Sequence, residues 1–187
     1  MTKTELNTTI NEAAVAAEAN LDLDALKSLS DDVIEGSIEN LNELVSGHAT
    51  AIWMREEKDG EEVLTIAYNV GGKGEEVEGV VSQSLDSGLV SKAFNDDETI
   101  CHQGFFKHKE QSSSVDKELG QITAHQIATP FKLFGQGVGA VTVIQTLAAG
   151  IEANSEWGFE NSDIENFEAH VRVLERLFEL NVIKQLI

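Results

Sequence analysis

The sequence has little that would cross-link the chain or place it in a membrane. Cys101 is the single cysteine in 187 residues, so no disulfide can form within the chain, as is usual in reducing compartments. No stretch approaches the roughly 20 apolar residues that a membrane helix needs. The N-terminus lacks the basic start and apolar core of a secretory signal. These absences predict a cytoplasmic protein without a membrane partner.

Basic residues are also scarce. The chain has 13 Lys and Arg against 33 Asp and Glu, a formal net charge of −20. DNA, RNA and anionic membrane surfaces would be repelled by this charge, so none of them is expected as a partner. The acidity is interpreted as a solvated surface that favours solubility. A basic partner or a cationic ligand is the alternative interpretation.

The length and the first helical patterns predict one main domain with an extension. A chain of 187 residues can bury the core of one ordinary domain without disulfides or metals. Apolar residues at helical spacing in an alanine-rich, acidic background predict a helical extension over residues 1–29, ahead of a domain over residues 30–187. A second amphipathic helix is expected from residue 31 to residue 45, ending near Gly47.

Strand patterns and turn residues alternate through the middle of the chain. Residues 49–55 and 63–69 are rich in β-forming residues, and the Asp59-Gly60 pair between them is a strong hairpin signal. Ser87 is expected to cap a short helix that carries Phe94. After an extended piece at residues 99–102, a polar excursion covers residues 105–120. Excursions of this length in compact domains are often functional lids or mobile loops.

Two apolar runs joined by a Gly-Gln-Gly turn at residues 135–137 predict the centre of the sheet. The first run alternates, with His125, Ile127, Thr129 and Phe131 on one face, which is the period of a half-buried strand. The second run, residues 138–147, is apolar on both faces. A strand of that kind must be covered on both sides. We therefore expect residues 124–133 to pair with residues 138–147 in an antiparallel sheet.

The last helix has more apolar positions than one face on a sheet requires. Over residues 163–186, one stripe contains Phe167, Val171, Leu174 and Phe178. Further apolar residues, Leu177, Leu180 and Ile187, point elsewhere. The surplus predicts a homodimer that uses this helix and the helix over residues 31–45.

In this order, the elements resemble a GAF domain, a sensory fold related to PAS. The segments that carry the resemblance are HATAIWM, EGVVSQSLDSGLVSKAFNDDETI, IATPFKLFGQGVGAVTVIQ and FENSDIENFEAHVRVLERL. The resemblance implies an α+β fold with a central, mostly antiparallel sheet of five to six strands. It also implies long N- and C-terminal helices on one face of the sheet, with short helices and loops on the other.

The resemblance also implies where a ligand would bind. In GAF domains ligands lie between one sheet face and the excursion, and transfer by position gives eight candidates: Trp53, Tyr68, Phe94, His102, Phe105, His125, Ile127 and Thr129. Ordinary core packing is the competing interpretation of each residue. Trp53 and Tyr68 carry the most weight, because each has a polar atom that needs a partner when buried.

Several kinds of GAF chemistry lack the residues that they need. Cys101-His102 looks like the bilin attachment step of phytochrome-related domains, but it lies in an extended segment far ahead of residues 126–130. The cyclic-nucleotide signature is only partly matched, since Ser155 stands where lysine is expected. The five histidines are scattered rather than set at ligand spacing, so no metal site is predicted. No catalytic residue and no cofactor are predicted.

The function expected from these patterns is regulatory. The chain is predicted to be a non-catalytic module that senses an unknown small molecule and signals through its terminal helices, as a homodimer or to a separate output protein. The first alternative is an enzyme of the GAF-type methionine sulfoxide reductase class, for which one cysteine cannot supply both an attacking and a resolving thiol. The second alternative is a ligand-free dimerisation scaffold.

Overall fold

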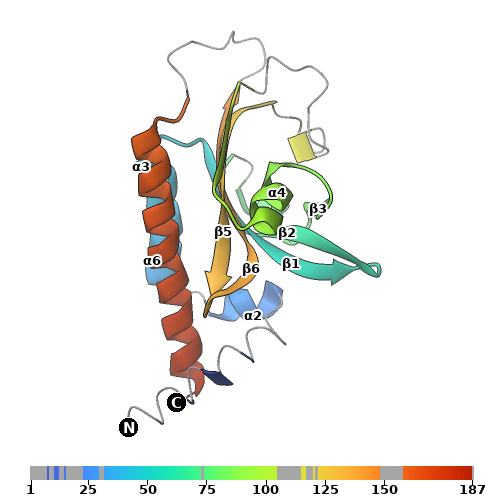
Figure 1. Ribbon diagram of the computed structural model, residues 1–187, viewed down its shortest axis with the longest axis vertical. Coiled ribbons are helices and arrows are strands. Elements are labelled where there is room, and N and C mark those ends of the chain that lie inside the picture. The colour runs from blue at the N-terminus through green and yellow to red at the C-terminus, as the bar shows by residue number, and fades with distance from the viewer. Residues whose placement is uncertain are drawn as a thin grey trace.

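The chain forms one six-stranded sheet in the order β3-β2-β1-β6-β5-β4 in the computed structural model (Figure 1). The structure describes residues 8, 11–12, 15, 23–29, 32–72, 74–104, 115–116, 120, 122–147 and 158–186. Most of the helix expected near the N-terminus, most of the excursion over residues 105–120 with Phe105, and Ile187 lie outside these residues. The elements are α2 (Leu23–Ser28), α3 (Asp32–Leu44), β1 (Ala49–Lys58), β2 (Glu61–Gly71), the 3-10 helix η1 (Gly74–Val77), β3 (Ser82–Ser84), α4 (Leu89–Asp96), β4 (Ile100–Gln103), β5 (Ile122–Leu133), β6 (Gln136–Leu147) and α6 (Asn161–Leu186).

Every strand pair in the sheet is antiparallel, as the alternating patterns predict. β5 and β6 pair along most of their length at the centre, with Ala128 opposite Thr142, and β1 pairs with β6 on the other side. The predicted five to six strands and the central hairpin are confirmed. β3 has three residues, too few to show a period in the sequence, and it was not predicted.

The two long hairpins turn through pairs of residues with positive φ. Asp59 and Gly60 have φ of 56° and 83°, as expected for an Asp-Gly turn whose twist matches that of the strands. The second turn is Phe134-Gly135, with φ of 52° and 83°. The predicted Gly-Gln-Gly turn is therefore right only at Gly135, because Gln136 and Gly137 already belong to β6. Glu179 Oε1 accepts the Phe134 N–H at 2.7 Å, which ties this turn to α6.

The two long helices α3 and α6 lie side by side along one face of the sheet (Figure 1). They run antiparallel, because Ser37 Oγ lies 3.3 Å from His170 Nε2 while Asn181 Nδ2 donates to the Leu29 carbonyl at 2.8 Å. Their apolar stripes form the main core with the sheet. Leu26 of α2 is fully buried in the same core, so the end of the expected extension over residues 1–29 is part of the packed domain. Among the helices that the structure describes, none is long and apolar enough to span a membrane.

Shorter elements cover the opposite face of the sheet. α4 lies there (Figure 1), and a second apolar cluster includes Trp53, Leu64, Ile66, Val90 and Val115. α4 begins after Gly88, whose φ is 88°, and no side chain caps its first turn. The predicted cap by Ser87 is therefore wrong. One face of the sheet is therefore covered by the two long helices, and the other face by α4 and the second apolar cluster.

Candidate functional site

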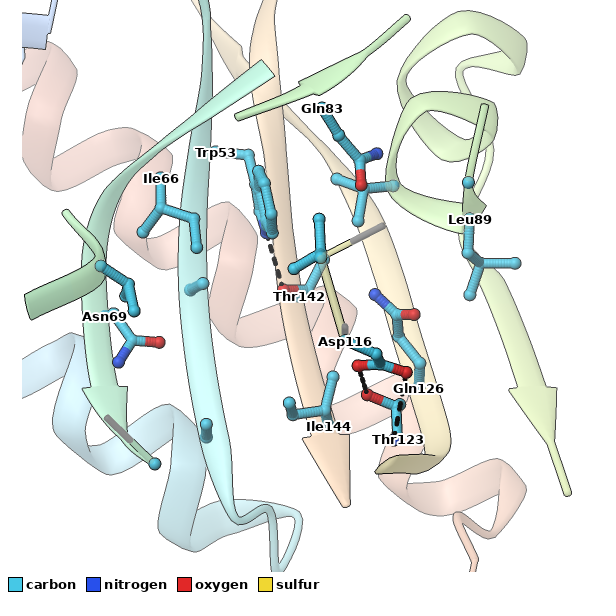
Figure 2. Close-up of a pocket in the computed structure, with 17 residues that line it drawn as sticks. Trp53, Ile66, Asn69, Gln83, Leu89, Asp116, Thr123, Gln126, Thr142 and Ile144 are labelled. Carbon is cyan, nitrogen blue, oxygen red and sulfur yellow. Dashed lines mark hydrogen bonds between the residues drawn. The ribbon is translucent and has the colours of Figure 1, made fainter. Parts of the chain in front are cut away.

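A cavity of about 70 Å³ lies on the sheet face that carries α4. β1, β2, β5 and β6 form its floor, and α4, η1 and residues 115–116 surround it (Figure 2). Its lining consists of Ala49, Ala51, Trp53, Ile66, Asn69, Gly72, Val77, Gln83, Gly88, Leu89, Val90, Val115, Asp116, Thr123, Gln126, Thr142 and Ile144. Small side chains on neighbouring positions of β1 leave this space open where larger ones would fill it. Cavities for drug-sized ligands are roughly 300–1,000 Å³, so the cavity suits only a compact molecule.

Buried polar pairs hold two sides of the cavity. The indole Nε1–H of Trp53 donates to Thr142 Oγ1 at 3.0 Å, between β1 and β6. Asp116, which is 8% exposed, accepts the Thr123 hydroxyl at 2.7 Å and the Thr123 N–H at 3.3 Å. Figure 2 shows Asp116, Thr123 and Gln126 together at one end of the cavity. These pairs satisfy polar groups that would be costly to bury alone.

The amide side chains of the lining add acceptors and donors. Gln83 Nε2 donates to Ser91 Oγ at 2.8 Å, and this bond orients the Gln83 amide beside α4. Gln126 is half-buried, and no hydrogen bond of its side chain joins it to another described residue. An amide of this kind is available to a ligand.

The charge of the lining is one-sided. Asp116 is the only charged residue among the described lining residues, which include no Lys, Arg or His.

The structure divides the predicted site residues between the two faces of the sheet. Trp53 lines the cavity. Phe94 of α4 is on the same side, packed against the second apolar cluster, but it does not line the cavity. Tyr68 is on the opposite face: its hydroxyl donates to the Leu26 carbonyl at 3.4 Å, and its ring lies 6.3 Å from that of Phe178.

Three predicted residues of β5 also face away from the cavity. Ile127 is fully buried in the main core under the long helices. His125 is buried near the start of α6, where its Nδ1 accepts the Gly104 N–H at 3.3 Å. The Oγ1 atom of Thr129 lies 3.1 Å from the Oγ1 atom of Thr99. The face chosen from the sequence for β5 is therefore the helix-covered face, so these side chains cannot line this cavity.

Adjacent residues of β4 take different sides. Cys101 pairs with Ile127 and His102 with Gln126, so Cys101 faces the long helices and His102 faces the cavity side, outside the lining. Burial raises the pKa of the Cys101 thiol, and the charge of Asp163 raises it further. Such a thiol is a poor nucleophile at neutral pH. Phe105 lies outside the described residues.

A wider cleft lies at the edge of the helix-covered face. It has a volume of about 320 Å³ and includes Thr129, Lys132, Arg172 and Glu175 in its lining. Lys132 pairs with Asp97 at 2.6 Å, and both side chains are exposed. Exposed pairs of this kind exchange readily with water. Within the described part of the chain, no group of three or more His, Cys, Asp or Glu could hold a metal ion.

Sequence reasoning missed most of the lining. Asp116 falls in a polar excursion with no pattern to place it. The sequence does place Gln126 on the opposite face of the strand from Ile127, because the two residues are adjacent. In the same way it places Thr142 on the opposite face from Val141 and Val143. The signal was present in the alternation, but the more apolar face of β5 was taken as the site.

Comparison with solved structures identifies the fold. The chain is similar to the GAF domain/HD domain protein of Geobacter sulfurreducens, with TM-score 0.61 and 15% identity over 89% of this chain and 100% of that one. It is also similar to the GAF-B domain of DevS from Mycobacterium smegmatis, with TM-score 0.60 and 13% identity over 82% and 95% of the two chains. The fold is that of a GAF domain.

The same fold occurs in an enzyme. The type II free methionine-R-sulfoxide reductase of Thermoplasma acidophilum matches with TM-score 0.58 and 16% identity, over 83% of this chain and 96% of that chain. No protein-family model matches the chain, and no curated protein matches its sequence. At these identities the likeness concerns the GAF fold and not the chemistry.

Proposed function

We propose that this GAF-like chain is a regulatory module that binds a small molecule in the cavity beside Trp53. The observation that carries the proposal is a cavity lined by buried polar groups, above all Asp116 on Thr123 and Trp53 on Thr142. A core selected for stability alone gains by replacing such groups with apolar side chains of similar volume. A concave site with few, well-placed polar groups is typical of ligand binding.

The sheet offers a route from the cavity to the long helices. Thr142 lies in the cavity wall, while its neighbours Val141 and Val143 are fully buried in the core beneath α3 and α6. Trp53 likewise lines the cavity, while its neighbours Ile52 and Met54 are buried in the same core. A ligand that displaces Trp53 or Thr142 must also shift side chains in contact with the helix layer, because packed cores transmit displacement. The output is a second copy of this chain or a separate protein.

The enzyme alternative would follow the sulfoxide reductase with the same fold. Sulfoxide reduction by thiols needs a thiolate that reaches the substrate. Cys101 faces the long helices, on the other side of the sheet from the cavity, and burial raises its pKa. These observations favour a binding module over a thiol enzyme that uses this cavity.

A native mass spectrum of freshly purified protein tests the proposal. We expect a non-covalent adduct, and we expect the variant Ala51→Leu to lose it, because Ala51 lines the cavity and a larger side chain fills the space. The control is Ala169→Leu, the same change at an exposed position of α6. An adduct that persists in Ala51→Leu would place the site elsewhere. A clean apo mass, with no metabolite in a denaturing extract, would favour the ligand-free scaffold.

A further inference from the structure

We propose that the ligand of the cavity is a small uncharged carboxamide, held through its N–H and C=O groups by neutral polar side chains of the wall. This inference rests on the proposed function, because it names the chemical class of ligand for the same cavity. Two oriented hydrogen-bonding groups and the size of the cavity carry it.

The amide oxygen of Gln83 is an acceptor that faces the cavity. Gln83 is 8% exposed, and its Nε2 donates to Ser91 Oγ at 2.8 Å and to the Ser87 carbonyl at 3.4 Å. Ser91 donates its single hydroxyl proton to the Ser84 carbonyl at 2.7 Å, so it must accept from Gln83, and this fixes which way the amide is turned. Figure 2 shows the oxygen directed into the cavity. Among the residues that the structure describes, none donates to it.

The hydroxyl of Thr142 offers the complementary donor. Thr142 is 3% exposed and lines the cavity from β6. Its Oγ1 accepts the Trp53 indole N–H at 3.0 Å, which leaves the hydroxyl proton to donate, and no acceptor pairs with that proton in the described part of the chain. The cavity therefore presents one buried acceptor and one buried donor, both neutral. Leaving such groups unpaired is costly, so a ligand that pairs both is favoured.

A carboxamide matches both groups at once. It has N–H donors for Gln83 Oε1 and, on the same carbon atom, a carbonyl oxygen for the Thr142 hydroxyl. A carboxylate has only acceptors and an ammonium group has only donors, so either of them would leave one group unpaired. An alcohol has both functions on one oxygen atom, which would have to lie within hydrogen-bond distance of both side chains.

The volume of the cavity limits the rest of the ligand. An apolar cavity of about 150 Å³ holds benzene, whereas this cavity has about 70 Å³. Ala51, Ile66 and Val90 are among its walls and would contact a short hydrocarbon chain. Size and walls together favour a short aliphatic carboxamide over a sugar or a nucleobase.

Three probes of similar size test the class: propionamide, 2-butanone and n-propanol. In 2-butanone a methyl group replaces the amide NH₂, so the acceptor and the shape are kept while the donor is lost. A cavity without oriented polar groups would bind 2-butanone better, because the amide loses more hydration on burial. We expect the reverse, with propionamide binding about tenfold or more tightly than 2-butanone and also more tightly than n-propanol.

The readout is the NMR resonance of the Trp53 indole N–H, because its acceptor Thr142 contacts the ligand in this proposal. Trp157→Phe distinguishes this resonance from that of the other indole. Gln83→Met tests the acceptor, since methionine has a similar length but only a weak acceptor. The preference for propionamide over 2-butanone should fall about tenfold in this variant. The control Gln136→Met makes the same change at an exposed position of β6 and should keep the preference.

The outcomes separate this inference from the proposed function. If 2-butanone or n-propanol binds as tightly as propionamide, or if the preference survives Gln83→Met, the carboxamide class is overturned and a ligand-binding cavity remains. No shift with any probe, together with an adduct in the native mass spectrum, would also overturn the class alone. No shift and no adduct would overturn both proposals. Should Gln83→Met fail to fold, the order of the three probes on the wild-type chain decides the question.

Discussion

At the scale of single residues, the position of Cys101 predicts a slow thiol. Its side chain faces α6, and burial together with the charge of Asp163 raises its pKa. The fraction of thiolate at neutral pH is therefore smaller than for an ordinary cysteine. We expect alkylation of the folded protein by iodoacetamide to have a pH midpoint above that of the unfolded chain. Cys101→Ser should fold and keep any ligand adduct; loss of the adduct in this variant would favour thiol chemistry.

Glu175 predicts a pH dependence of stability. It accepts the Lys132 N–H at 2.7 Å, and its pKa is raised by burial first and then by the charge of Glu179, although the bond from Lys132 lowers it. A raised folded pKa favours the protonated form, so the stabilisation is fully present below the unfolded pKa and is lost as the pH rises through the folded pKa. Glu175→Gln keeps an acceptor without the charge.

We therefore expect Glu175→Gln to raise the thermal midpoint by about 1–2 °C at neutral pH, with the gain disappearing at acidic pH. The matched variant is Glu179→Gln. Glu179 also accepts a backbone N–H but pairs with Arg176, so removing its charge should bring no gain. Thermal melts of the three proteins across acidic and neutral pH measure the difference. Equal gains in both variants would show that total charge, and not the burial of Glu175, is responsible.

The two aromatic residues given most weight show what the sequence could and could not place. A regular hairpin that starts at the Asp59-Gly60 turn puts Trp53 opposite Ile66 and Tyr68 on the same face. The register shifts at Ile52/Trp53, so that Tyr68 pairs with Ile52 instead. β1 keeps a regular register with β6 at this point, so the extra residue lies in β2. A bulge of this kind moves the later side chains of β2, including that of Tyr68, to the other face of the sheet. Alternation alone cannot locate a bulge, which is why Trp53 reached the cavity and Tyr68 did not.

At the scale of elements, close strand packing predicts opposite effects of one substitution at two glycines. A Cβ at Gly139 of β6 would overlap the Trp53 carbonyl of β1, whereas a Cβ at Gly36 of α3 would meet nothing within 4 Å. We expect Gly139→Ala to lower the free energy of unfolding by about 1–3 kcal/mol through overpacking. Gly36→Ala should raise it by about 0.5–1 kcal/mol, because alanine is the better helix former. Urea unfolding of both variants measures the contrast, and a neutral Gly139→Ala would show that β1 and β6 separate without cost.

The elements themselves were predictable where a long period or a strong turn marked them. Both halves of the central hairpin, α3 and α6 follow from apolar spacing over ten or more residues. The start of α4 did not follow, since Gly88 enters the helix with a positive φ and no side chain caps it. The cavity was still harder to predict. Its lining combines several strands and Asp116 from the excursion, and only the folded chain brings these residues together.

At the scale of the whole molecule, charge and exposed apolar surface oppose each other. The chain carries a net charge of −20, which repels a second copy over about 8 Å at physiological salt and over longer distances at low salt. Two helices nevertheless expose large apolar side chains. Val33 and Leu44 of α3 are 62% and 45% exposed, and Val173 and Leu180 of α6 are 51% and 54% exposed. A spacing of 11 residues on α3 and 7 on α6 puts each pair on one side of its helix.

We propose that a second copy covers these residues and that the resulting homodimer passes on the bound state. Light scattering should then give a dimer mass at micromolar concentration in physiological salt, and the dimer fraction should fall in low salt as repulsion is less screened. Val173→Glu with Leu180→Glu should give a monomer that still folds, because both side chains lie outside the core. Val80→Glu, at a position 61% exposed in the loop between η1 and β3 and outside both long helices, is the control for added charge and should remain dimeric. A monomeric wild-type chain in physiological salt would contradict the proposal. If the control Val80→Glu also gave a monomer, the dissociation would be caused by the added net charge and not by the loss of apolar surface on α6.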